Sequence, residues 1–268
     1  MTLMPYLSKI ALNPRRRQAV SLLGNPHRLH AAVLAGLAAQ PVTERVLWRM
    51  ENSTPHRAEI LVLTQNRPSW QHLIDEAGWP GADGGEPLIA DYAPLLERIA
   101  LGKEFGFRLT ANPVQTVPRP TNPSEQQNAR LKAHAEQPDA AGHRPRGFRV
   151  AHRTAAQQLH WILARAERHG FTIPQTPSDA PAPGLKADNS LTAGPAVSIV
   201  SRDILRFHKH RAGPRVTLST ATFEGRLRVT DPDALRVALL GGIGPAKGYG
   251  QGLLTLAPVR AEAAMTNA

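Results

Sequence analysis

The hydrophobic pattern of the first hundred residues switches between a period of two and a helical period. Residues 6–12 alternate between apolar and polar side chains, which predicts a strand. The next apolar residues recur at helical spacing, at Leu29, Val33, Leu34 and Leu37. Asn25 and Pro26 stand just before them, in the order of an N-cap and a first-turn proline, so we expect a helix to begin at Pro26.

Four more segments complete the first half of the chain. Strands are predicted over residues 44–51 and 58–65, a short helix over residues 67–78, and a closing strand over residues 104–114. The resulting order, β-α-β-β-α-β, is typical of a ferredoxin-like unit.

The second half repeats this order more loosely. The predicted elements are a strand over residues 148–152, an amphipathic helix over 154–170, a strand pair over 196–229 that turns near 212–214, a helix over 231–240 and a strand over 252–258. We therefore predict an α+β fold of two tandem ferredoxin-like (βαββαβ) units.

Two polar, proline-rich stretches, residues 114–147 and 174–195, lack sustained apolar periodicity. We interpret the first as a linker and the second as a mobile loop. The predicted domains are an N-terminal unit with the histidine helix over residues 1–117, a polar linker or insertion over 118–147, a C-terminal unit with a basic hairpin and a glycine-rich loop over 148–260, and a tail over 261–268.

Composition adds a strong charge signal. The 268 residues include 32 Lys and Arg against 21 Asp and Glu, for a net charge of +11. This balance favours a polyanionic partner, either nucleic acid or an acidic membrane surface. No apolar run approaches the roughly 20 residues of a membrane-spanning helix, and the N-terminus shows no signal-peptide pattern. Together with the lack of cysteine, these features predict a cytoplasmic protein without disulfides.

Two histidines stand in the first turn of the helix that begins at Pro26. His27 and His30 are three residues apart, so they share one helix face at about 5–6 Å. Imidazole can give or take a proton near neutral pH, and the pair is therefore a candidate for acid–base catalysis. The alternative is that both are ordinary surface histidines near a helix start.

The glycine-rich segment "GGIGPAKGYGQG" (241–252) precedes the last predicted strand. It is not a Walker loop, because Lys247 has Ala246 before it and Gly248 after it, and because the segment does not open a helix. What remains is either a flexible connection or a loop whose backbone approaches a ligand closely, with Lys247 available for a phosphate. Its candidate glycines are Gly242, Gly244, Gly248 and Gly250.

A cluster of basic residues lies on the predicted hairpin of the second half. Its members are Arg206, His208, Lys209, His210, Arg211 and Arg215. Such a hairpin suits the phosphates of an A-form RNA stem, whose deep major groove resists readout of the bases. The alternative is a solvated charged turn. No metal site is predicted, because the other histidines are irregularly spaced and have no acidic residue nearby.

Six segments in order resemble one family across nearly the whole chain. They are "YLSKIALNP" at the start, "NPHRLHAAV" opening the first helix, "FRLTANPVQTV", "QLHWILAR" in the middle helix, "TFEGRLRV", and "GIGPAKGYGQGLLTLAP" near the end. This pattern is similar to the CasE-type endoribonucleases of the RAMP superfamily, which process precursor CRISPR RNA in type I-E systems.

The resemblance implies a tandem ferredoxin-like fold that binds the CRISPR repeat hairpin, cuts on its 3′ side without metal or other cofactor, and joins a surveillance complex. Cutting would leave a 2′,3′-cyclic phosphate. His30 matches the family's principal catalytic histidine. His27 stands where the family usually has tyrosine, so we expect it to act as the partner of His30 or to matter less. Some relatives carry a lysine further along this helix, and here Lys247 or Arg28 would have to supply that charge.

A rival hypothesis from a different class is a non-catalytic RNA-binding RAMP subunit of a CRISPR ribonucleoprotein, in which the histidines are spectators. Fold alone does not separate the two. A DNA-binding regulator is disfavoured because no helix-turn-helix pattern is visible.

Overall fold

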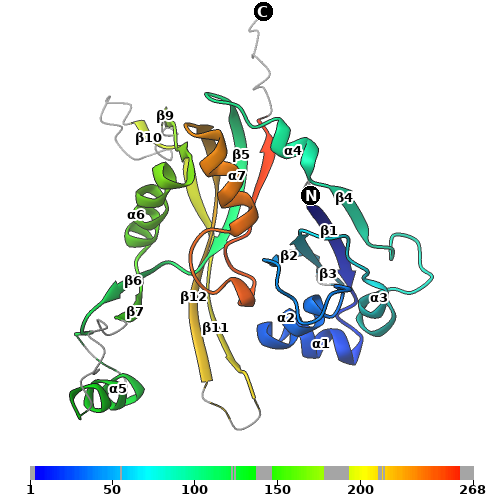
Figure 1. The fold of residues 1–268 in the computed structure, drawn as a ribbon, viewed down its shortest axis with the longest axis horizontal. Coiled ribbons are helices and arrows are strands. Elements are labelled where there is room, and N and C mark those ends of the chain that lie inside the picture. Colours follow the sequence, from blue (N-terminus) through cyan, green and yellow to red (C-terminus); the bar gives the residue numbers. More distant parts are fainter. Residues whose placement is uncertain are drawn as a thin grey trace, which may run out of the picture.

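The computed structural model describes residues 4–54, 56–121, 123, 125–136, 147–177, 193–210, 213 and 215–259. Two antiparallel sheets form its frame (Figure 1). The predicted tail over 261–268 and most of the predicted mobile loop lie outside these residues. No helix in the described ranges is long and apolar enough to cross a membrane.

The first sheet has the strand order β2-β3-β1-β4. Its strands are β1 (Tyr6–Leu12), β2 (Leu47–Thr54), β3 (Arg57–Thr64) and β4 (Leu88–Asp91). The helices of this unit are α1 (Arg17–Leu23), α2 (Pro26–Leu34) and α3 (Gln71–Ala77). Their apolar side chains form one buried cluster with those of β1, β2 and β3, so the helices cover one face of the sheet.

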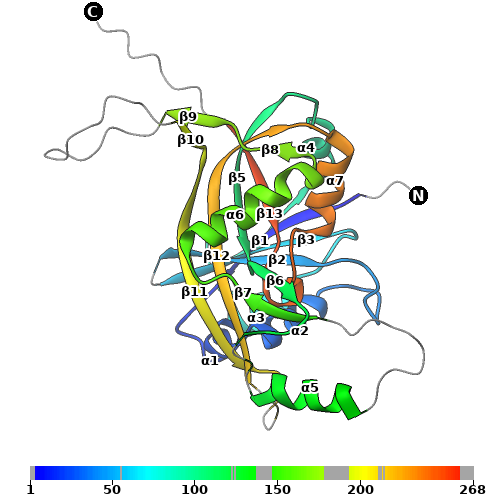
Figure 2. The ribbon, with the colours of Figure 1, turned by 90° about the vertical axis from the view of Figure 1, so that its left-hand side faces the viewer.

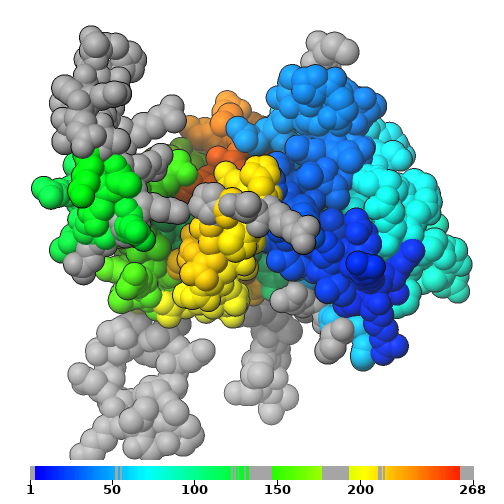
Figure 3. All heavy atoms as spheres, turned by 90° about the horizontal axis from the view of Figure 1, so that it is seen from below, coloured from blue at the N-terminus to red at the C-terminus, as the bar shows by residue number. Residues whose placement is uncertain are grey.

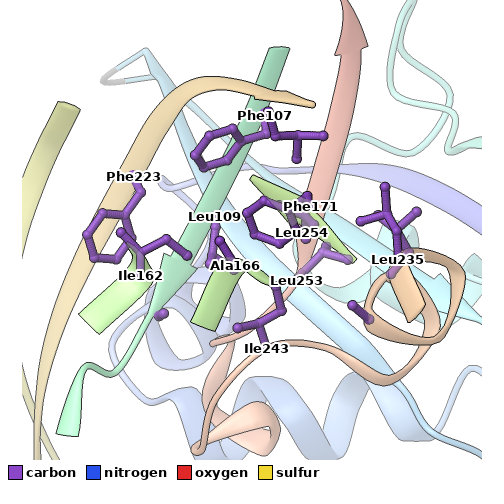
Figure 4. Packing of buried hydrophobic residues seen from close by; sticks show 14 of the residues in the cluster. Phe107, Leu109, Ile162, Ala166, Phe171, Phe223, Leu235, Ile243, Leu253 and Leu254 are labelled. Atoms are coloured by element: carbon purple, nitrogen blue, oxygen red, sulfur yellow. The ribbon is translucent and has the colours of Figure 1, made fainter. Parts of the chain in front are cut away.

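The second sheet repeats that order, as β11-β12-β5-β13. Its strands are β5 (Glu104–Ala111), β11 (Val197–His208), β12 (Arg215–Val229) and β13 (Leu254–Pro258), and β8 (Phe171–Thr172) pairs with the end of β12. The helices α6 (Ala155–Ala166) and α7 (Pro232–Gly241) lie across its face (Figure 2). Phe223 and Ile162 meet in the core between β12 and α6 (Figure 4). Both sheets thus have the ferredoxin-like order, and the predicted fold class is confirmed.

One predicted strand belongs to the other unit. The strand over residues 104–114 was expected to close the first sheet, but β5 pairs with β12 and β13 of the second sheet. The first sheet is closed by β4, which is short and mostly exposed and so lacks the alternation that marks a half-buried strand. Alternation predicted β5 itself correctly, because Phe105, Phe107 and Leu109 face a core, but it carries no information about which core.

The segment between β5 and α6 also differs from the prediction. β7 (Phe148–Ala151) does not open the second sheet but pairs with β6 (Val114–Val117) in a separate ribbon. The stretch interpreted as a linker contains helix α5 (Glu125–Glu136). The remaining short elements are α4 (Ala93–Glu97), η1 (Glu167–His169), β9 (Gln175–Pro177), β10 (Ala193–Pro195) and η2 (Lys247–Tyr249).

A buried arginine joins the two units. Arg49 on β2 is only 3% exposed, and its Nη1 donates hydrogen bonds to the carbonyl oxygens of Arg108 (3.0 Å) and Leu253 (3.1 Å) in the second sheet. Its Nη2 donates to Thr255 Oγ1 at 3.0 Å, and the guanidinium pairs with Glu51. One side chain thereby fixes the edge strand β2 of the first unit against β5 and the residue before β13.

We expect Arg49→Ala to lower the free energy of unfolding by about 3–5 kcal/mol, because it leaves two carbonyl groups between the units without their donor and removes one of the two arginine partners of Glu51. Urea denaturation measures the loss. The matched control is Arg228→Ala, which removes an exposed arginine paired with Glu104 and should cost about 1 kcal/mol or less. Equal losses for both variants would contradict a special role of Arg49.

Candidate active site

Three segments from distant parts of the sequence meet beside the start of α2. They are the first turn of α2, the glycine loop with η2, and the end of the β11–β12 hairpin. Asn25 Nδ2 donates to the carbonyl oxygen of His208 at 3.1 Å, which ties the helix start to the hairpin. Viewed from below, the hairpin lies against the α1–α2 end of the first unit (Figure 3). The predicted histidines, hairpin and loop therefore form one site.

The helix start is set by its cap. Asn25 Oδ1 accepts the backbone N–H of His27 at 3.0 Å, and Pro26 occupies the first turn, where its missing N–H is no loss. The predicted cap and first residue are therefore confirmed. Because α2 begins at Pro26, His27 and His30 lie one turn apart near the helix end that carries a partial positive charge.

His30 is held by a tryptophan of β2. Trp48, which is 1% exposed, donates its indole N–H to His30 Nδ1 at 3.2 Å. An indole nitrogen only donates, so Nδ1 must be the acceptor and the neutral ring carries its proton on Nε2. Nε2 faces the glycine loop, where a Cβ on Gly248 would lie 3.3 Å from it. Nε2 is thus the nitrogen that reaches the meeting point of the three segments.

The surroundings of His30 favour its neutral form. Burial lowers the pKa of its imidazole, and the positive charges of His27 and Arg45 lower that pKa further. The hydrogen bond from Trp48 acts in the same direction, because Nδ1 can accept it only while unprotonated. A polyanion bound at Nε2 would raise the pKa again.

Two cations lie near this imidazole. Arg45 is exposed and precedes β2 by two residues, and its charge acts on the pKa of both His30 and Lys247. Burial lowers the pKa of the Lys247 ammonium, and Arg45 adds to that effect. The sequence pointed to Lys247 but missed Arg45, which carries no motif and is brought to the site only by the path of the chain into β2.

His27 contacts the other two segments of the site. Its ring lies edge-on to that of His210 on the hairpin, with centroids 5.9 Å apart, and 6.5 Å from that of Tyr249 in the glycine loop. Its positive charge acts on the pKa of His30. The structure therefore brings the two predicted histidines together, each with a different environment.

The predicted basic residues of the hairpin and of α2 divide into three groups. Arg206, His208, Lys209, His210 and Arg215 are exposed on the β11–β12 hairpin. Arg211 lies outside the described residues. Arg28 is exposed on α2, but its Nη1 donates to Ser21 Oγ of α1 at 2.7 Å, so it is directed along the first unit rather than into the site.

The glycine loop is shaped by backbone that other residues adopt rarely. Gly242, Gly244 and Gly250 have φ values of +74°, +85° and +77°. A Cβ on Gly250 would also come within 2.6 Å of the Trp48 ring. Glycine is therefore needed at this position both for its positive φ and for this close contact. The loop thereby packs against the same tryptophan that holds His30. No cluster of three metal-ligating side chains occurs in the part of the chain that the structure describes.

Comparisons with known proteins agree with this geometry. A model of the protein family described as "CRISPR associated protein" matches residues 5–258. The CRISPR-associated endoribonuclease Cse3 of Thermus thermophilus is 29% identical over 260 residues, which cover 94% of this chain and 100% of the relative.

Solved structures show the same fold. Thermus thermophilus Cse3 bound to an RNA representing a pre-cleavage complex matches with a TM-score of 0.67 at 27% identity, covering 95% of this chain and 100% of that chain. A chain of a CRISPR RNA-guided surveillance complex in a pre-nicking state matches with a TM-score of 0.56 at 21% identity, with coverage of 95% and 100%.

Trp48→Phe should raise the pKa of His30 toward its ordinary value, because the neutral ring loses the hydrogen bond that favours it. NMR titration of the imidazole resonances measures this pKa, and ¹⁵N shifts should place the proton on Nε2 in the wild-type protein. His152, next to the separate ribbon, should titrate identically in both proteins. A neutral His30 with its proton on Nδ1 would contradict the assigned hydrogen bond.

Proposed function

The chain belongs to the family of CRISPR-associated proteins, and from this premise we propose that it is an endoribonuclease that cuts the repeat hairpin of precursor CRISPR RNA. The observation that carries the proposal is the meeting of a pair of imidazoles with a basic hairpin and a close-packed glycine loop. The relation to Cse3, named an endoribonuclease and solved with an RNA representing a pre-cleavage complex, supports it.

The proposed reaction needs two proton transfers and no metal. The ribose 2′-oxygen attacks the adjacent phosphorus, a 2′-O–P bond forms, and the P–O5′ bond breaks. One group takes the 2′-hydroxyl proton and another gives a proton to the leaving 5′-oxygen. The products are a 2′,3′-cyclic phosphate and a 5′-hydroxyl.

We assign the donor role to His30 and the acceptor role to His27. Nε2 of His30 faces the loop, and a phosphate bound there favours the imidazolium. Forming the imidazolium adds a proton at Nδ1 and gives up the Trp48 hydrogen bond, and the imidazolium then releases its Nε2 proton to the 5′-oxygen. His27, one turn earlier on the same face, is the imidazole available for the 2′-hydroxyl. Arg45 and Lys247 would stabilise the charge of the phosphorane.

The hairpin is proposed to bind the RNA stem. Lys209 and His210 are exposed at the end of β11, and Arg215 is exposed where β12 begins. A projecting basic hairpin can grip phosphates across an A-form groove without reading bases. Since Asn25 ties the hairpin to α2, a stem held there lies beside the two histidines.

The proposal extends to the setting of the reaction. We include membership of a type I-E surveillance complex and a cytoplasmic location, as expected from the sequence. The match to a chain of a CRISPR RNA-guided surveillance complex supports only a shared fold.

In a single-turnover assay with the cognate repeat hairpin and EDTA, His30→Ala should cut about 10²- to 10⁴-fold more slowly than wild type while still binding RNA, because a proton donor is lost. A loss of similar size is expected for His27→Ala. His160→Ala, an exposed histidine of α6, is the control and should keep the wild-type rate. Undiminished cleavage by both variants would overturn the assignment of the two histidines, RNA binding without cleavage by wild type would favour the non-catalytic RNA binder, and a need for metal would overturn the mechanism.

Removing hairpin charges should weaken binding rather than chemistry. For Lys209→Ala/Arg215→Ala we expect a higher Kd and a logarithmic salt slope reduced by about one per lost phosphate contact, with the cleavage rate at saturating RNA nearly unchanged. Filter binding at several salt concentrations measures this. Arg98→Ala/Arg228→Ala removes two exposed charges away from the hairpin end and is the control. An equal effect of both pairs would mean that net charge alone binds the RNA.

A further inference from the structure

A cavity of about 610 Å³ lies between the two units, directly beside the site. Its walls come from β2, β5, β11 and β12, the start of α2, and the glycine loop. Trp48, Pro26 and Tyr249 belong both to its lining and to the surroundings of the histidines. Its volume is within the range of pockets that hold a small ligand or a nucleotide.

The charges along the wall formed by β2 and β5 are already paired, and Asp203 of β11, which also lines the cavity, accepts a hydrogen bond from Ser201 Oγ at 2.6 Å. Glu51 pairs with both Arg49 and Arg108, and Arg108 also pairs with Glu224. The hydroxyl groups of Thr110 and Thr222 are hydrogen-bonded to each other at 3.0 Å. A phosphate would bind weakly here because the arginines already have carboxylate partners. An uncharged flat ring with polar edges would suit such a wall.

The cations at the hairpin end of the cavity are not paired in this way. Arg206 lines the cavity and has no carboxylate partner among the residues that the structure describes. Lys209, just beyond it, places its Nζ 5.9 Å from the centre of the Tyr249 ring. The cavity therefore offers free positive charge for phosphates at its entrance and a neutral interior for a base.

Tyr249 forms part of the wall beside His27. Its ring packs against Phe207 at a centroid distance of 4.9 Å and lies 6.5 Å from that of His27. Its backbone is fixed, because its N–H donates to Ala246 and its carbonyl accepts Gln251 Nε2 at 3.1 Å. Its hydroxyl has no hydrogen-bond partner among the described residues. An aromatic ring held this firmly is suited to stacking on a nucleobase.

A buried acceptor lies next to this ring. Gln251 is 4% exposed and lines the same cavity. Its Nε2 is used by the Tyr249 carbonyl, and its Oε1 accepts no hydrogen bond from the described part of the chain. A buried acceptor without a donor is costly, and the amino or imino group of a base could supply one.

We propose that this cavity binds the unpaired nucleotide immediately 3′ of the cut, with its base stacked on Tyr249. This inference rests on the proposed function. The ring of His27 is a neighbour of both His210 of the hairpin and Tyr249 of the cavity. A strand that leaves a stem held on the hairpin therefore has the histidines and the cavity side by side. Holding that nucleotide fixes the leaving 5′-oxygen in line with the attacking 2′-oxygen.

The test crosses protein variants with RNA variants in single-turnover cleavage. The proteins are wild type, Tyr249→Ala and Tyr249→Phe, and the hairpins are intact, abasic at the nucleotide 3′ of the cut, or abasic in the 5′ flank. Loss of the 3′ base or of the ring should each lower kcat/KM about 5- to 150-fold, the worth of one stacked base. The two losses should not add, and Tyr249→Phe should behave as wild type.

Four outcomes would overturn the inference while leaving the endoribonuclease intact. They are an unchanged rate on the 3′-abasic RNA, a loss confined to the 5′-abasic RNA, fully additive losses, and a Tyr249→Phe variant as slow as Tyr249→Ala, which would mean that the hydroxyl acts chemically. Tyr6→Ala removes a half-buried tyrosine with Arg67 over its ring, outside the cavity, and should leave the response to abasic RNA unchanged. If wild type cuts no hairpin at all, the proposed function itself fails.

Discussion

The site depends on the two units keeping one orientation, and the buried guanidinium of Arg49 is a hydrogen-bonded link between them. It lies beside apolar side chains of the first unit, such as Leu47 and Leu63, that pack into the core of the second. The histidines come from the first unit, whereas the hairpin and the glycine loop come from the second. Trp48 and Arg49 are neighbours on β2 with side chains on opposite faces. The first holds His30, and the second holds the strands β5 and β13. One strand thus couples the position of the imidazole to the position of the second unit, which carries the proposed RNA-binding hairpin.

The same arrangement sets the chemistry. Trp48 fixes the tautomer of His30. Because residue 248 is a glycine, no side chain covers Nε2 from the loop. Burial and neighbouring positive charge lower the pKa of the His30 imidazole, and a bound anion would raise it again. Among the described residues that line the cavity, Arg49 and Arg108 are paired with carboxylates, whereas Arg206 is not.

Local signals in the sequence predicted the local features well. Asn25 and Pro26 located the start of α2, the strand alternation located the hairpin, and the glycine spacing located the loop. What the sequence could not reveal was long-range. The period of β5 predicted a strand but not its sheet, because both cores accept the same alternation. Arg45, Trp48 and Tyr249 resemble any loop cation or packed aromatic until the chain folds them around the histidines.

The most direct test of the account is the structure of this protein bound to a repeat hairpin that carries 2′-deoxyribose at the cut and therefore cannot react. We predict that the scissile phosphate lies within about 3 Å of His30 Nε2, the reach of a hydrogen bond, with the stem on the β11–β12 hairpin. A stem seated on the β6–β7 ribbon, or a scissile phosphate remote from α2, would contradict it.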